Sequence, residues 1–222
     1  MSVSLPAAVF FDLDGTLADT ADDLATPVNL MRIERGLTPL PLAEYRPFAS
    51  AGARGLLGIG LGVTPDDEHF PKLRDDFLNL YEKDIVVHTR LFDGMPAVLD
   101  WLESRNIRWG IVSNKMEYLV QQVVSGLGLS ERTVLAYGGD SAPRPKPYPD
   151  LLKRALKETG LNANQCWYIG DDARDIQAGK AVGMTTIAAA YGYCSPEAAA
   201  SWGADHLIHS PAGLLTMLKN CW

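Results

Sequence analysis

Short apolar runs alternate with longer amphipathic segments along most of the chain. Residues 7–11 form one such run, which ends abruptly at two carboxylates and a glycine, so we expect a buried strand with a sharp exit. Strands separated by helices of roughly ten residues predict βαβ units and a mostly parallel sheet. The same patterns predict further strands at 108–112, 133–137, 165–169, 185–190 and 206–209, and helices at 95–104, 117–125, 149–159, 176–182 and 211–219.

The pattern changes between residues 19 and 88. Alanine, leucine and charged residues recur there at helical spacing, notably in 22–35 and 71–83. Prolines and the glycines between Gly52 and Gly62 punctuate these segments. We therefore expect a helical domain, 19–88, inserted into an α/β domain formed by 1–18 and 89–222.

Composition and charge narrow the class of protein. The 222 residues are 47% hydrophobic and 21% charged, which is ordinary for a globular protein with a real core. The net charge of -7 argues against a nucleic-acid or anionic-membrane partner. The three cysteines show no CxxC spacing, so neither a disulfide framework nor a zinc site is indicated. With no signal peptide or transmembrane segment recognised, we expect a cytoplasmic protein.

Four polar clusters follow predicted strands or lie between them. In a parallel sheet the site lies beyond the carboxyl ends of the strands, so these clusters should converge at one edge. They contain carboxylates, a hydroxyl, an amide and one lysine. The candidate residues are Asp12, Asp14, Ser113, Asn114, Lys146, Asp171 and Asp175.

The residue types in these clusters suit the handling of phosphate. Carboxylates gathered at strand ends require a counter-charge, and an all-oxygen donor set favours Mg²⁺ over zinc. Lys146 lies in a proline-rich loop and supplies a positive charge, while Ser113 supplies a hydroxyl. A metal, a lysine and a hydroxyl together form the kind of cradle that phosphoryl transfer needs.

The four motifs resemble those of one known superfamily. Asp12-Leu-Asp14-Gly-Thr16, Ser113-Asn114, Lys146-Pro147 and Gly170-Asp171-Asp172-Ala-Arg-Asp175 are similar, in this order, to the four motifs of the haloacid dehalogenase superfamily. The resemblance covers essentially the whole chain and is nearest to the phosphoglycolate phosphatase branch. It implies a Rossmann-like, doubly wound α/β core with an inserted helical cap of the C1 type. It also implies Mg²⁺-dependent hydrolysis of a small phosphomonoester.

The resemblance also implies a role for each candidate residue. Asp12 would be the nucleophile that forms an aspartyl-phosphate, and Asp14 the general acid and then the base. Mg²⁺ would bind the Asp12 carboxylate, the Asp14 main-chain carbonyl and Asp171. Asp175 would contact the metal through water or orient Lys146. Ser113 and Lys146 would bind the phosphoryl group, and Asn114 would lie on the substrate side. Asp172, a helix-start residue by its position, stays open as an alternative ligand to Asp171.

Several alternatives remain open at this stage. Dehalogenases and phosphonatases of the superfamily lack a carboxylate at the position of Asp14, so we rank phosphomonoester hydrolysis above both. A mutase uses the same residues, whereas a phosphate-responsive receiver domain lacks the insertion. Arg54, in the insertion, is either a surface charge or a candidate for binding a substrate carboxylate, which both phosphoglycolate and N-acetylmuramic acid 6-phosphate possess. The oligomeric state, monomer or homodimer, is left open.

Overall fold

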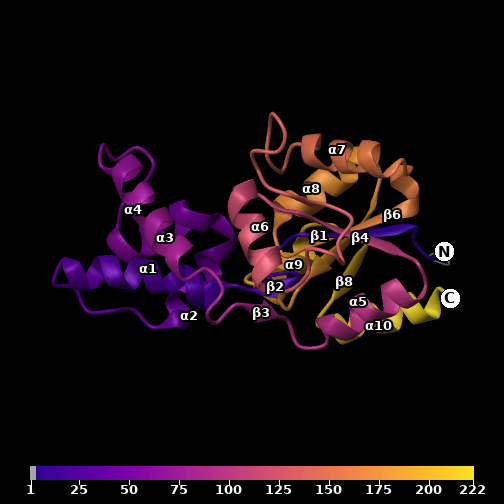
Figure 1. The fold of residues 1–222 in the computed structure, drawn as a ribbon, viewed down its shortest axis with the longest axis horizontal. Coiled ribbons are helices and arrows are strands. Elements are labelled where there is room, and N and C mark those ends of the chain that lie inside the picture. Colours follow the sequence, from indigo (N-terminus) through magenta and orange to yellow (C-terminus); the bar gives the residue numbers. More distant parts are fainter. Residues whose placement is uncertain (1–3) are drawn as a thin grey trace. The chain divides into compact units, whose positions relative to one another are not determined.

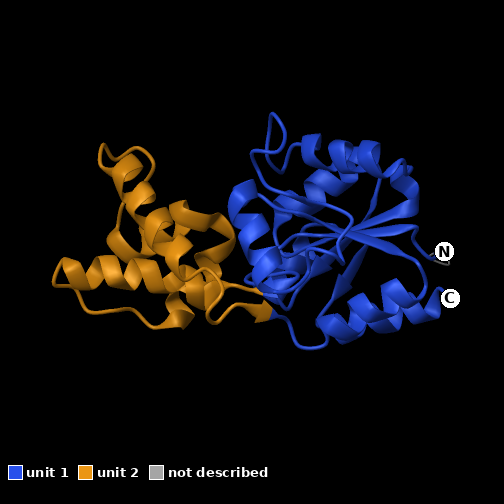
Figure 2. Ribbon diagram, in the orientation of Figure 1, with its two compact units in different colours: residues 1–18, 91–222 blue, residues 19–90 orange. Residues whose placement is uncertain are grey.

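The computed structural model describes residues 4–222 and divides them into two compact units. One unit combines the chain up to Ala18 with Leu91–Trp222, and the other is Asp19–Arg90 (Figure 2). The smaller unit therefore ends at Arg90, two residues beyond the expected end at residue 88. Where the chain crosses between the units, β2 (Ala18–Asp19) and β3 (Arg90–Leu91) pair as a two-stranded sheet.

A six-stranded sheet forms the centre of the larger unit, with the strand order β5-β4-β1-β6-β7-β8. Every neighbouring pair in it is parallel. Phe11, the last residue of β1, is paired with Ile111 on one side and Ile169 on the other. This register brings the residues that follow three strands to the same edge. The strands are β1 (Ala8–Phe11), β4 (Arg108–Val112), β5 (Ala136–Tyr137), β6 (Cys166–Gly170), β7 (Thr185–Ala189) and β8 (His206–Ile208).

Helices cover both faces of this sheet. Figure 1 shows α5 and α10 side by side on one face, and α7 and α8 on the other. The expected doubly wound α/β fold is thereby confirmed. The helices are α5 (Met95–Ser104), α6 (Glu117–Gly126), α7 (Asp150–Thr159), α8 (Ala173–Val182), α9 (Pro196–Ser201) and α10 (Pro211–Asn220), with a short 3-10 turn, η2 (Ala163–Gln165). None of the helices in residues 4–222 has the length and apolar character needed to cross a membrane.

Strand β5 is shorter than the expected 133–137. The hydroxyl of Thr133 lies 2.7 Å from the carbonyl oxygen of Leu135 and 3.4 Å from that of Trp109. The residues of β5 paired with β4 are Ala136 and Tyr137. The backbone still bonds to β4 before them, because the N–H of Val134 donates to the carbonyl of Trp109 and the carbonyl of Leu135 accepts the N–H of Ile111.

The smaller unit contains α1 (Ala21–Glu34), α2 (Leu42–Tyr45), a 3-10 segment η1 (Arg46–Ala51), α3 (Gly52–Leu61) and α4 (Phe70–Lys83). Helices α1 and α4 agree with the expected segments to within one residue at each end. The glycines expected to punctuate the helices lie at the start of α3, inside it and at its C-cap, Gly62. A Cβ atom on Gly60 would lie 2.2 Å from Cγ1 of Val28, so a glycine is needed where α3 packs on α1.

A buried carboxylate ties the end of the smaller unit to its first helix. Asp23, in the first turn of α1, is only 3% exposed. Its carboxylate accepts the backbone N–H groups of Val87, His88 and Thr89 at 2.8–3.0 Å. The chain is thus fixed to α1 immediately before it enters β3.

Candidate active site

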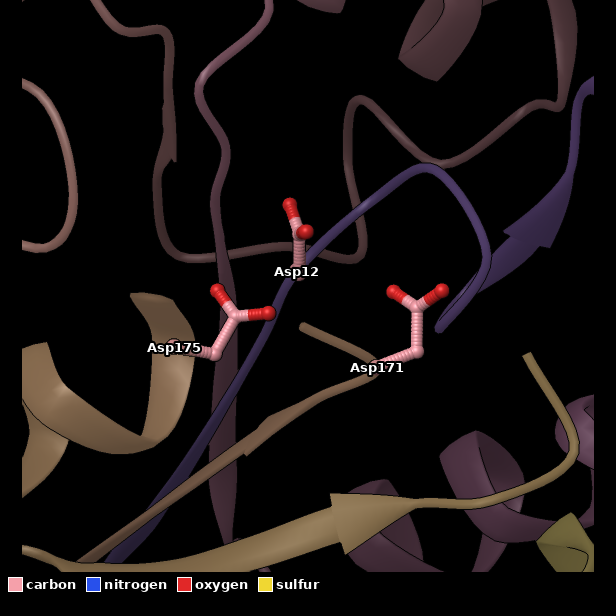
Figure 3. A group of neighbouring side chains, drawn as sticks. All are labelled: Asp12, Asp171 and Asp175. Carbon is pink, nitrogen blue, oxygen red and sulfur yellow. The ribbon is translucent and has the colours of Figure 1, made fainter. Parts of the chain in front are cut away.

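Three carboxylates meet at the carboxyl edge of the large sheet (Figure 3). Asp12 directly follows β1, Asp171 directly follows β6, and Asp175 lies in the first turn of α8. Each contributes an oxygen atom to a group in which all three atoms lie within 4.8 Å of one another. Asp12 is 8% exposed, and Asp171 and Asp175 are 1% exposed. Three ionised groups this close and this buried would repel strongly unless cations compensate them.

Lys146 supplies one of these cations. Its Nζ lies 3.0 Å from Oδ1 of Asp12 and 2.6 Å from Oδ1 of Asp175. The same Nζ donates to the carbonyl oxygen of Val112 at 3.1 Å, and the Tyr168 hydroxyl donates to this carbonyl at 2.8 Å. Burial alone would lower the pKa of Lys146, but the two carboxylates outweigh burial and raise it. The lysine therefore stays charged.

The charges of this cluster do not balance within the chain. Three carboxylates and one ammonium leave two negative charges when all are ionised. Burial raises the pKa of Asp171 well above its usual range, and the nearby charge of Asp12 adds to this. Burial also raises the pKa of Asp175, although Lys146 opposes the shift. A divalent cation would supply the missing charge, and the all-carboxylate donor set suits a hard metal ion.

Asp171 is held in place by the loops on either side of it. The Thr16 hydroxyl donates to its Oδ1 at 3.0 Å, and the backbone N–H of Tyr193 donates to Oδ2 at 2.9 Å. Gly15 has φ 81, and a Cβ atom there would lie 2.2 Å from the Asp171 Oδ2. The glycine after the two aspartates thus meets two requirements, a left-handed turn and room for the Asp171 carboxylate.

Asp14 lies apart from this triad and has a different partner. Nζ of Lys115 lies 2.9 Å from Oδ1 and 3.2 Å from Oδ2 of Asp14. The sequence analysis missed Lys115. Its position directly after Ser113-Asn114, at the end of a predicted strand, was the available signal, since that position faces the same edge of the sheet.

The motif after β4 supports the site in two ways. Ser113 is 2% exposed, and its Oγ accepts the backbone N–H of Lys115 at 3.2 Å. The Asn114 amide donates to the backbone carbonyl of Lys146 at 2.9 Å and accepts its N–H at 2.8 Å. The expected place of Asn114 on the substrate side stays a prediction. Its side chain fastens the loop that carries Lys146.

Asp172, the alternative to Asp171, has partners within its own helix. Asp172 is the N-cap of α8 and accepts the backbone N–H of Arg174 at 2.9 Å. Its Oδ1 also lies 2.7 Å from Nε of Arg174. Burial opposes ionisation here, but the hydrogen bonds from Arg174 outweigh it and lower the pKa of Asp172. Asp171, not Asp172, is the member of the triad, as the GDxxxD spacing favoured. Arg54 lies in the first turn of α3 in the other unit, where it is exposed.

Known proteins are similar to this chain over most of its length. The family model for haloacid dehalogenase-like hydrolases matches residues 9–189. A phosphoglycolate phosphatase of Xanthomonas campestris pv. campestris is 42% identical over 94% of this chain and 95% of its own length. An N-acetylmuramic acid 6-phosphate phosphatase of Pseudomonas putida is 38% identical over 96% of both chains.

A solved structure agrees with the fold. A haloacid dehalogenase-like hydrolase from Streptococcus pneumoniae superposes with a TM-score of 0.82 at 21% identity, covering 97% of this chain and 99% of its own. The resemblance seen in the four motifs therefore extends to most of the sequence and to the three-dimensional fold. This chain belongs to the haloacid dehalogenase-like hydrolase family, and it is a phosphatase of that family.

Proposed function

We propose that the protein is a Mg²⁺-dependent hydrolase of a small phosphorylated metabolite and that Asp12 is its covalent nucleophile. The observation that carries this proposal is the buried group of Asp12, Asp171 and Asp175, which a single lysine, Lys146, compensates only in part. Such a site attracts a divalent cation, and the cation with the lysine would attract a phosphoryl group.

The chemistry proceeds in two displacements at phosphorus. A carboxylate oxygen of Asp12 attacks the phosphorus atom, and the bond from phosphorus to the ester oxygen breaks. Asp14 gives its proton to the leaving oxygen, which departs as an alcohol. Asp14, now ionised, then takes a proton from a water molecule that attacks the aspartyl-phosphate. Phosphate is released and Asp12 is restored.

The remaining residues bind and orient. Mg²⁺ supplies neutralisation of the phosphoryl charge when it is bound, and we assign it to the carboxylates of Asp12 and Asp171 and the main-chain carbonyl of Asp14. Lys146 and the hydroxyl of Ser113 hold phosphoryl oxygens. Asp175 orients Lys146 through the 2.6 Å contact, or reaches the metal through water.

We propose that residues 19–90 act as the cap that selects the substrate and excludes water. Two relatives are named for the hydrolysis of phosphoglycolate and of N-acetylmuramic acid 6-phosphate. Both compounds carry a carboxylate besides the phosphate, and Arg54 is our candidate for binding it. Phosphoglycolate is our first choice of substrate, and the sugar phosphate is the second. The cysteine pattern fits the reducing cytoplasm, which is where we place the protein.

The test compares Asp12→Asn with wild type on a panel of phosphomonoesters. We expect Asp12→Asn to lose turnover on every ester while keeping the thermal midpoint of the wild type. EDTA should abolish the activity of the wild type, and added Mg²⁺ should restore it. Asp66→Asn, which changes an exposed carboxylate in the other unit, is the matched control and should stay active. Substantial turnover by Asp12→Asn would refute the mechanism. Isomerisation of a sugar phosphate without phosphate release would favour a mutase.

A further inference from the structure

A partly buried ion pair joins Asp14 to a residue that has no role in the proposed function. Asp14 lies in the turn after β1, and Lys115 lies in the turn after the neighbouring strand β4. The Lys115 side chain is 6% exposed and that of Asp14 is 14% exposed. Surface lysines keep their charged end in water, so a lysine enclosed to this degree is held by its surroundings.

The contact geometry fixes the carboxylate of Asp14. Nζ of Lys115 lies within hydrogen-bond distance of both of its oxygens, at 2.9 and 3.2 Å, so rotation of the carboxylate would break at least one contact. The backbone of Lys115 is itself fixed, because its N–H donates to Oγ of Ser113. A short chain of contacts thus runs from the end of β4 to the Asp14 carboxylate.

We propose that Lys115 is a positioning residue that holds the Asp14 carboxyl group in the orientation required for proton transfer to the leaving oxygen. This inference rests on the proposed function, in which Asp14 is the general acid. Proton transfer requires the acid within hydrogen-bond reach of the leaving oxygen, so an Asp14 that rotates freely delivers its proton less often. Lys115 itself transfers no proton and touches no reacting atom.

A different role for Lys115 would be to attract the anionic substrate. Loss of a positive charge would then weaken all phosphomonoesters by a similar factor. Loss of the orientation of the acid has another consequence. An acidic leaving group can depart from phosphorus without a proton, whereas a basic leaving group needs one, so only esters with basic leaving groups should react more slowly. The dependence of rate on the leaving group therefore distinguishes positioning from general attraction.

The experiment measures kcat/KM for 4-nitrophenyl, phenyl and 4-methoxyphenyl phosphate, which differ mainly in the acidity of the leaving phenol. It compares wild type, Lys115→Met and Asp14→Asn, with Lys219→Met as a matched control because Lys219 is exposed on α10. We expect the decrease in kcat/KM caused by Lys115→Met to be about tenfold larger for phenyl phosphate than for 4-nitrophenyl phosphate. This is a part of the roughly 10²–10⁴-fold contribution that a general acid makes to the rate. Lys115→Arg, which keeps the charge and the donors, should restore the wild-type dependence.

Equal losses on all three esters, or no loss, would overturn the inference. Lys115→Gln keeps a donor without the charge, and it is measured in the same way if Lys115→Met does not fold. A larger loss on phenyl than on 4-nitrophenyl phosphate in that variant supports positioning, and equal losses again refute it. Failure of the proposed function gives a different result, because Asp12→Asn would then stay active or Asp14→Asn would show the wild-type dependence on the leaving group.

Discussion

Replacing Lys146 with methionine would remove the cation from the buried carboxylate group while keeping a side chain of similar length. Lys146 lies 3.0 Å from Asp12 and 2.6 Å from Asp175, and its side chain is 2% exposed. Removing one partner of a buried ion pair costs about 3–5 kcal/mol, because the other charge remains buried and unpaired. For a chain of this size each kcal/mol lowers the thermal midpoint by about 2–4 °C, so we expect a decrease of about 6–20 °C at neutral pH in EDTA.

The loss of stability in Lys146→Met should depend on pH, and the direction of this dependence follows from the pKa of Asp175. Burial raises the folded-state pKa of Asp175, and Lys146 opposes this shift. Without Lys146 the folded-state pKa rises further above the unfolded value, so the folded state binds more protons than the unfolded state between the two values. Stability then falls as pH rises through this window. In the wild type the pKa of Asp175 is already raised to about 7, so the difference between variant and wild type should stay constant below this pH and widen as pH rises above it.

The assay is thermal unfolding followed by circular dichroism, in EDTA, at a series of pH values. Lys153→Met is the control, because Lys153 is an exposed lysine on α7. An unchanged midpoint for Lys146→Met at neutral pH, or a loss that is the same at every pH, would show that Lys146 does not compensate the buried carboxylates.

Three further predictions concern the metal, the smaller unit and the substrate. Asp171 and Asp175 have raised pKa values without metal, so Mg²⁺ should stabilise the protein more at neutral pH than at about pH 5. At a concentration of a hundred times its Kd, the total stabilisation by Mg²⁺ is about 2.7 kcal/mol. Equal stabilisation at both pH values would contradict this prediction. Asp23→Ala should lower the free energy of unfolding by about 1–3 kcal/mol and speed hydrogen exchange of the backbone amides at residues 87–89. Asp22→Ala, at the exposed neighbouring position, should do neither. Arg54→Ala should raise KM for carboxylate-bearing esters more than for phenyl phosphate, and an equal change would exclude Arg54 from substrate selection.

Much of the fold was predictable because the evidence for it is local. Apolar runs of strand length separated by amphipathic segments specify βαβ units, and strand ends in such units carry the site. Asp12, Lys146, Asp171 and Asp175 could therefore be placed at one edge before any coordinates were known. The role of Gly60 was not predictable in this way, because glycine is a helix breaker by local propensity, whereas here the absence of a Cβ on Gly60 lets two helices approach.

The sequence by itself determined the order of the strands along the chain, the residue types of the site and the family to which they belong. Only the tertiary structure decided the partners: Asn114 with the Lys146 backbone, Asp172 with Arg174, and Lys115 with Asp14, across 101 positions. The physical reason is that a side chain's partner depends on register and burial, which many distant residues set together. The raised pKa of Asp171 also depends on the tertiary structure, because its largest cause is burial, and the depth of burial is set by the packing of distant residues.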